Sequence, residues 1–278
     1  MPEREYDPHL SHTIWELERA LKLGRDSEAL RRALIEAHLD QLWHLEERLA
    51  VPRPQRSFLL LQPRPSDSLL LLPGELSSAE DVLPIAEHFH QRGCAALGAN
   101  LAYRTLDEPA LSPHYWQTCA DEAENRFDIL TPYATRVAVL GVGLGALLAL
   151  HLAAVRRVSA VLAVFPTLHV GEPWQLRWRM MLQRLLRREV RTPTGWEHQR
   201  RLAAVKAHET TGKIAVPLFV VAEDRRDNSD AGRSAQMGQK LIHRAATQVH
   251  VLRPGEEASP RALPPALLDD LLAFVRKH

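Results

Sequence analysis

The chain has 278 residues, of which 45% are hydrophobic and 25% charged, and its net charge is +1. Such a chain can form one large hydrophobic core with a smaller appendage. The near-neutral charge argues against a nucleic-acid-binding protein. Cys94 and Cys119 are the two cysteines, and no secretory leader pattern is visible, so we expect a cytoplasmic location. The apolar runs at 69–72 and 144–152 are too short to cross a bilayer.

The first fifty residues predict two helices. Residues 13–16, Thr-Ile-Trp-Glu, match a capping box, which predicts that a helix begins there. Gly24 supplies a left-handed residue that ends this helix. Asp26 or Ser27 is expected to cap a second helix that reaches about Ala50.

The second helix carries two neighbouring stripes of mainly apolar residues, which together are wider than one packing contact needs. One stripe holds Leu30, Leu34, Ala37, Gln41 and Leu45, and the other holds Ile35, Leu39, Leu42 and Leu49. We therefore expect a helical hairpin, residues 1–56, to pack on the rest of the chain. The surplus width leaves homodimerisation through these N-terminal helices as a further hypothesis.

From residue 57 to residue 278, predicted strands alternate with predicted helices. The strands are expected at 58–61, 68–72, 94–97, 137–140, 161–165, 218–221 and 248–252, and the helices at 79–92, 114–130, 144–155, 231–245 and 264–277. This alternation predicts an α/β fold with a mainly parallel central sheet covered by helices on both faces. An Arg- and Trp-rich helical insertion at about 167–212 interrupts the alternation. It is expected to form a cap over the carboxyl edge of the sheet, where open α/β sheets bind ligands.

The most informative stretch is residues 136–155. An apolar strand ends at Gly141-Val-Gly-Leu-Gly145, and an Ala/Leu-rich helix follows. A glycine-rich strand-to-helix turn is typical of a phosphate-binding loop or of a nucleophile elbow. Ala146 replaces the third glycine of the dinucleotide fingerprint, and neither a ribose-binding acid nor a Gly-Lys-Ser/Thr sequence is present. The elbow pattern Gly-x-Ser-x-Gly fits better, except that Gly143 stands at the serine position.

Residues 66–277 resemble the α/β-hydrolase superfamily, in particular its bacterial carboxylesterase and monoacylglycerol-lipase branch. The resemblance rests on Leu-Leu-Leu-Leu-Pro-Gly at 69–74, the elbow at 141–145, the cap, and Pro-Leu-Phe-Val-Val-Ala-Glu-Asp at 217–224. It implies a serine nucleophile, a histidine base, a carboxylate that orients the histidine, and two backbone oxyanion donors.

Carried over position by position, the resemblance implies a degenerate triad. The nucleophile position is Gly143, the acid is Asp224 or Asp227, and the histidine position is Glu256. Another histidine, His250, lies two positions inside the last predicted strand, so it is expected on a sheet face rather than beyond the strand's end. Glycine has no nucleophilic atom, and a glutamate is too acidic to serve as the base near neutral pH unless it is strongly buried. We therefore expect no serine-hydrolase activity.

The remaining predicted ligand contacts come from three segments. The resemblance places the oxyanion donors at Glu75 or Leu76 and at Leu144, and the cap contributes Trp174 and Trp178. The helix at 174–191 is basic and amphipathic, which predicts either a lid over an apolar pocket or peripheral contact with an anionic membrane. No cofactor or metal site is predicted. Cys94 and Cys119 are interpreted as buried structural thiols, and Ser77 or Ser78 as a helix cap.

Three functional hypotheses follow. The first is a catalytically degenerate hydrolase-fold protein that binds an apolar or acyl-type ligand, or a protein partner. The second is a weak carboxylesterase or thioesterase in which Asp224, Asp227 or Glu256 activates water. The third is a scaffold whose crevice is filled by its own side chains. An ester-hydrolysis assay separates the second hypothesis from the first.

Overall fold

The computed structural model describes residues 7–63, 65–74, 77–101, 115–166, 214–223, 247–252, 261 and 263–278. Its elements are α1 (Pro8–Lys22), α2 (Glu28–Arg48), η1 (Arg53–Gln55), β1 (Phe58–Leu60), β2 (Asp67–Leu72), α3 (Ala79–His90), β3 (Ala95–Gly98), α4 (Tyr115–Leu130), β4 (Arg136–Val142), α5 (Leu144–Val155), β5 (Val161–Val164), β6 (Leu218–Glu223), β7 (Thr247–Leu252) and α9 (Pro265–Lys277). The predicted cap at 167–212 and the predicted helix at 231–245 lie outside the described residues.

The strands form one seven-stranded sheet in the order β1-β3-β2-β4-β5-β6-β7. Every neighbouring pair is parallel except β1 and β3. In that antiparallel pair Phe58 lies opposite Gly98, so β1 begins where β3 ends. The prediction of a mainly parallel sheet is confirmed.

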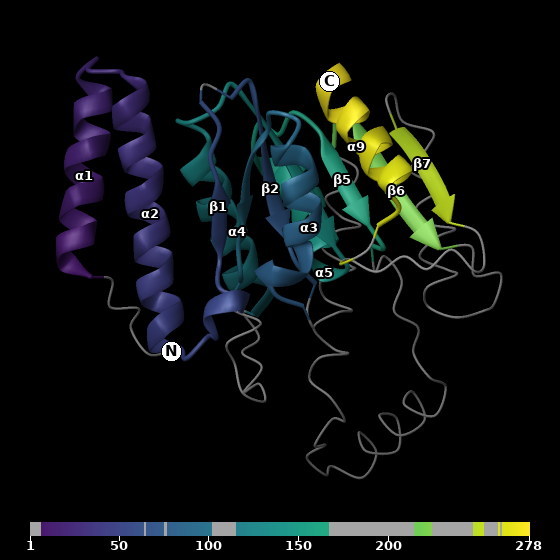
Figure 1. Ribbon diagram of the computed structural model, residues 1–278, viewed down its shortest axis with the longest axis horizontal. Coiled ribbons are helices and arrows are strands. Elements are labelled where there is room, and N and C mark those ends of the chain that lie inside the picture. The colour runs from purple at the N-terminus through teal and green to yellow at the C-terminus, as the bar shows by residue number, and fades with distance from the viewer. Residues whose placement is uncertain are drawn as a thin grey trace, which may run out of the picture.

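Helices cover both faces of this sheet (Figure 1). Residues of α2, α4 and α5 share a core with one face, and residues of α3 and α9 share a core with the other. The inner strands are buried on both sides; all six residues of β2 are buried, for example. Such strands read as continuous apolar runs, which is why the sequence pattern located them.

The N-terminal hairpin begins earlier than the capping-box pattern predicted. Asp7 caps α1, and its side chain accepts hydrogen bonds from the backbone N–H groups of His9 and Leu10. The hydroxyl of Thr13 instead donates to the carbonyl of His9, inside the helix, so the prediction that Thr13 caps the helix was wrong. Gly24 has a φ of 76°, which confirms it as the left-handed stop.

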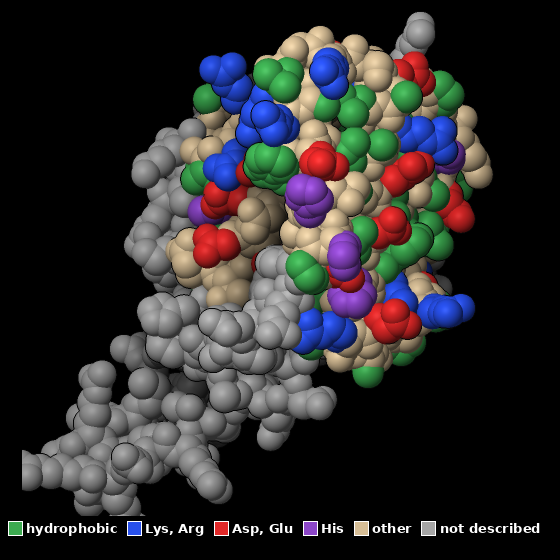
Figure 2. Space-filling model, turned by 90° about the vertical axis from the view of Figure 1, so that its left-hand side faces the viewer, with side chains coloured by type: hydrophobic (Ala, Val, Ile, Leu, Met, Phe, Trp, Pro, Cys, Tyr) green, Lys and Arg blue, Asp and Glu red, His purple; other side chains and the backbone are tan. Residues whose placement is uncertain are grey.

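Helix α2 uses both of its apolar stripes within the chain. Leu34 and Ala37 pack against Ile14 of α1, whereas Ile35 and Leu39 belong to the core shared with α4 and α5. The surplus width of the apolar surface therefore has an intramolecular explanation. Figure 2 shows the outer face of the hairpin, where charged, apolar and histidine side chains are mixed. Homodimerisation through this face stays a prediction.

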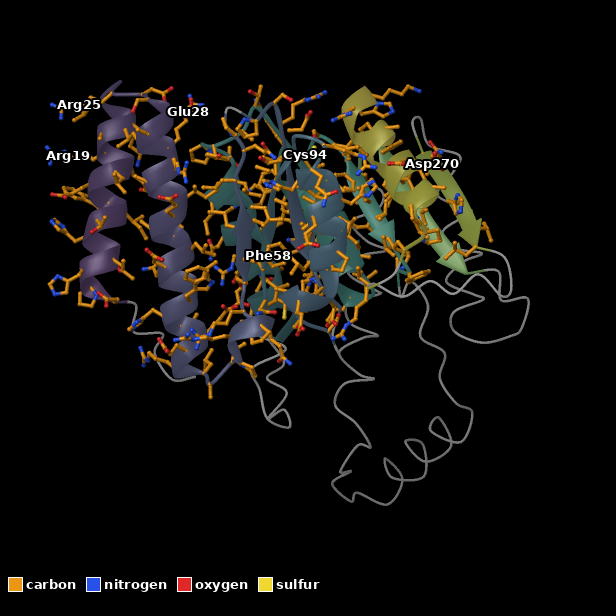
Figure 3. The ribbon with its side chains drawn as sticks, in the orientation of Figure 1. Arg19, Arg25, Glu28, Phe58, Cys94 and Asp270 are labelled. Atoms are coloured by element: carbon orange, nitrogen blue, oxygen red, sulfur yellow. The ribbon has the colours of Figure 1, made fainter. Side chains whose placement is uncertain are left out.

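The two cysteines are buried, as predicted (Cys94 is labelled in Figure 3). Cys94 directly precedes β3, and Cys119 lies in α4. Burial raises the pKa of the Cys94 thiol, and the nearby Asp67 carboxylate adds to this shift. A thiol with a raised pKa is a poor nucleophile, which supports a structural role for Cys94.

Candidate functional site

The candidate site lies where the chain reverses its direction across the sheet. From β2 the chain passes through α3 to β3 on one side of β2, and then through α4 to β4 on the other side. The carboxyl ends of β2 and β4 therefore flank a topological switch point. Open α/β sheets bind their ligands in the crevice outside such a point.

Gly143 forms the turn between β4 and α5 with φ 55° and ψ −114°. These angles suit glycine, and an L-residue held there is strained by about 1–3 kcal/mol. The N–H of Gly143 donates to the Val164 carbonyl at 3.0 Å, and its carbonyl accepts from the Ala146 N–H at 3.2 Å. Gly143 is partly exposed, whereas Val142 and Leu144 on either side are buried. The turn has the geometry predicted for a nucleophile elbow, with no side chain at its apex.

The two flanking glycines are required by close backbone approach. A Cβ atom on Gly141 would lie 2.1 Å from the carbonyl oxygen of Gly145. A Cβ on Gly145 would lie 2.1 Å from the carbonyl oxygen of Leu72 and 2.7 Å from that of Pro73. The glycines thus let α5 begin directly against the end of β2.

The loop after β2 lies against the elbow. A Cβ on Gly74 would lie 3.3 Å from the carbonyl oxygen of Val142. Both the N–H and the hydroxyl of Ser77 donate to the Gly74 carbonyl at 3.1 Å. Ser78 is the N-cap of α3, as predicted, and its N–H donates to the Asp81 carboxylate at 2.6 Å.

Of the predicted site residues, the structure places Gly143 and Leu144 at the elbow. Glu75, Leu76, Trp174, Trp178, Asp224, Asp227 and Glu256 lie outside the described residues. His250 lies inside β7, where it is paired with Val221 of β6, so its predicted location within a strand is confirmed.

Two features at the carboxyl edge were not predicted. Phe165 directly follows β5 and has a φ of 49°, an unusual value for a bulky residue. No sequence signal predicts this conformation. Glu46, Ser57 and Asn100 form a buried polar group at the ends of α2 and β3. Its one sequence signal is that Glu46 continues the apolar stripe of Ile35 and Leu39.

Asp81 is held by groups that favour its ionised form. Burial by itself raises the pKa of Asp81, but the Ser78 N–H and the Arg261 guanidinium together lower it below its usual value. Arg261, just before α9, donates to the Asp81 carboxylate. The ion pair links the start of α3 to the C-terminal part of the chain.

This shift predicts a pH-dependent contribution to stability. A depressed carboxyl pKa in the folded state stabilises the fold above the unfolded pKa of about 3.9, and the contribution disappears as pH falls through the folded pKa. Asp81→Asn should therefore cost about 1 kcal/mol at pH 7, a modest value because Arg261 is largely exposed. The difference in the free energy of unfolding should shrink as the pH falls below the unfolded pKa of about 3.9. Urea unfolding at several pH values measures it, with the exposed Asp270→Asn of α9 as control (Figure 3). A deficit that does not change with pH would contradict the assignment.

Within the described ranges, no group of three or more His, Cys, Asp or Glu side chains is placed to hold a metal ion. No helix in those ranges has both the length and the apolar character needed to span a membrane.

Comparisons with known proteins bear on the fold. No family model matches the sequence, and no curated protein sequence matches it. Among solved structures, one of the metagenome-derived lipolytic enzymes LipS and LipT is similar, with a TM-score of 0.59 and 12% identity over 81% of this chain and 99% of that one. Est1E from Butyrivibrio proteoclasticus with bound ferulic acid has a TM-score of 0.59 and 14% identity over 80% of this chain and 94% of its own.

A third similar structure is the monoacylglycerol lipase of Paleococcus ferrophilus, with a TM-score of 0.58 and 11% identity over 80% of this chain and 98% of that one. Identities this low establish the fold alone. The strand order, the parallel register and the elbow between β4 and α5 agree with that likeness. The chain therefore has the α/β-hydrolase fold.

Proposed function

We propose that this protein is a catalytically degenerate member of its fold, which uses the crevice at the switch point to bind an apolar or acyl-type ligand without hydrolysing it. The observation that carries the proposal is the elbow itself. Its backbone geometry and its close glycine contacts are those of a nucleophile-bearing turn, yet Gly143 presents no side chain.

Ester hydrolysis by a serine hydrolase needs a hydroxyl oxygen that attacks the acyl carbon and a base that takes the proton of this hydroxyl. Glycine supplies no such atom, and the sequence places Glu256 where the base is expected. When serine-hydrolase triad members are removed, the catalysis that survives comes from the oxyanion hole and from substrate binding. Binding is therefore the capacity most directly retained by this arrangement.

The described edge of the sheet at the switch point is apolar. The last residues of the strands around the switch point are Leu72, Val142 and Val164, and each of them is buried. Two of the similar structures are described as a lipolytic enzyme and a monoacylglycerol lipase, and a third holds ferulic acid, an aromatic acid. Ligand sites are generally lined by apolar groups with few polar contacts, which agrees with this composition.

The first part of the test is hydrolysis of short- and medium-chain p-nitrophenyl esters. We expect turnover no faster than that of an equal amount of an inert protein. If turnover is clear, and Glu256→Ala or Asp227→Ala abolishes it, the proposal is wrong. A serine-free esterase that uses the corresponding carboxylate then replaces it.

The second part measures binding of decanoate by displacement of a fluorescent fatty acid. Gly143→Ala and Gly143→Leu both introduce a Cβ at φ 55°, so both should lose about 1–3 kcal/mol of stability. Only the leucine side chain extends beyond Cβ into the crevice. Decanoate binding should persist in Gly143→Ala and be lost in Gly143→Leu. No binding to the wild-type protein, or equal binding to both variants, would contradict a ligand site above Gly143.

A further inference from the structure

A buried polar network joins the N-terminal hairpin to the edge of the crevice. Glu46 of α2, Ser57 before β1 and Asn100 after β3 are buried, with 6%, 2% and 6% of their surface exposed. The Glu46 Oε1 atom accepts from the Ser57 hydroxyl at 2.6 Å and from the Asn100 Nδ2 atom at 2.8 Å. The Ser57 N–H also donates to this carboxylate, at 2.9 and 3.0 Å from its two oxygens.

The Asn100 side chain connects Glu46 to helix α3. Its Oδ1 atom accepts from the N–H of Ala79, the first residue of α3, at 2.9 Å. Its Nδ2 atom donates to Glu46 and also to the Gln55 carbonyl, at 2.6 Å. The orientation of the amide is fixed by these partners, because a flipped amide would direct Nδ2–H groups at the Ala79 N–H.

The contacts of Glu46 in the described part of the chain come from neutral donors, on Ser57 and Asn100. A buried carboxylate is costly unless its hydrogen bonds are made, so it constrains the groups that supply them. Asn100 supplies one of these bonds and at the same time holds the start of α3. The position of that helix start therefore depends on a carboxylate that belongs to the hairpin.

Helix α3 begins at the end of the loop that borders the elbow. Gly74 lies against the carbonyl of Val142, and Ser77 is bonded back to Gly74. Ser78 and Ala79 follow at once, and they are held by Asp81 and Asn100. A shift of the start of α3 would move this loop relative to Gly143.

We infer that Glu46 is a positioning residue for the ligand site: through Asn100 it fixes the start of α3, and with it the loop after β2. The N-terminal hairpin is then part of the machinery that shapes the crevice. What the loop does for a ligand rests on the proposed function, whereas the coupling from Glu46 to Ala79 does not.

Hydrogen exchange of the Ala79 amide, followed by NMR on the full-length protein without ligand, tests the coupling. Glu46→Ala should accelerate exchange of this amide about tenfold or more, because Asn100 loses the partner that orients it. Glu47→Ala is the matched control, since it removes the neighbouring, exposed carboxylate. Leu34→Ala is a second control that weakens hairpin packing without touching the network. Neither control should change exchange at Ala79.

If Glu46 has a purely structural role, Glu46→Ala will lower global stability and will accelerate exchange of the Ala79 amide no more than Leu34→Ala does. That result would overturn the inference. If Glu46→Ala does not accumulate as folded protein, Glu46→Gln serves instead. It keeps one acceptor oxygen and should accelerate Ala79 exchange in the same direction by a smaller factor.

Decanoate affinity then separates this inference from the proposed function. Faster Ala79 exchange together with weaker decanoate binding in Glu46→Ala supports both. If Glu46→Ala accelerates Ala79 exchange but the wild-type protein binds no decanoate, the coupling is supported and the proposed ligand site is refuted. Unchanged exchange refutes the coupling, whatever the ligand result.

Discussion

Gly145→Ala should destabilise the protein by about 3–5 kcal/mol, although alanine is the better helix former. Gly145 is the second residue of α5, where helix propensity alone would favour alanine by about 1 kcal/mol. The added Cβ would lie 2.1 Å from the Leu72 carbonyl oxygen and 2.7 Å from that of Pro73. Those atoms belong to the backbone at the end of a central strand, so they cannot rotate away as a side chain can.

Urea unfolding followed by tryptophan fluorescence measures this effect. Gly93→Ala is the matched control, because its Cβ would meet nothing within 4 Å, although Gly93 has a φ of 91°. It should cost about 1–2 kcal/mol from backbone strain alone. Equal losses in the two variants would show that β2 and α5 do not approach as closely as the structure has them.

The central strands and helix α5 were predictable from the sequence because each has a clear local pattern. The central residues of β2, β4 and β5 are buried on both faces, so the sequence shows uninterrupted apolar runs at 69–72, 137–140 and 161–164. Helix α5 was predicted with its observed bounds, since glycine precedes it and its Ala/Leu-rich run contains no proline. Spacing also placed Gly143 at the elbow.

What the sequence could not provide were contacts between segments distant in the chain. Nothing near Gly145 in the sequence reports that Leu72 lies against it. Asn100 and Glu46 are 54 positions apart, so their hydrogen bond leaves no periodic trace. The start of α1 was misplaced for a related reason. Asp7 and Thr13 both suit helix starts, and local patterns do not rank two such candidates.

Gly143 is a turn residue at the apex of the elbow, the position where a nucleophile-bearing turn carries its serine. In a nucleophile elbow the strained backbone conformation holds a serine hydroxyl above the sheet. Here glycine adopts the same angles without that strain, while Gly141 and Gly145 still bring β4, α5 and β2 together. The backbone architecture of the elbow is thus retained without a side chain at its apex, which supports the proposed function.

Asn100→Leu should lower the free energy of unfolding by about 3–5 kcal/mol, because several groups lose a hydrogen bond at once, a buried carboxylate among them. The Ala79 N–H and the Gln55 carbonyl each lose a hydrogen bond, and the Glu46 carboxylate loses its amide donor. Leucine has the same number and branching of side-chain heavy atoms as asparagine but a larger volume, so no cavity forms and overpacking adds to the loss. Urea unfolding measures the loss. A cost below about 1 kcal/mol would mean that the network contributes no more than a single solvent-compensated hydrogen bond.

Asn100→Asp tests the same network through its charge. The new side chain keeps an acceptor for the Ala79 N–H, but it places a second carboxylate where Nδ2 lies 2.8 Å from Glu46. Two carboxylates so close cannot both stay ionised, so the folded-state pKa of one of them is raised. A raised carboxyl pKa makes the fold more stable as pH falls through that pKa, because the folded protein then binds a proton that the unfolded chain does not. The free energy of unfolding of Asn100→Asp should therefore fall furthest below that of the wild type at pH 7, and the difference should shrink towards pH ~5. A pH-independent deficit would show that Glu46 and residue 100 do not share one buried site.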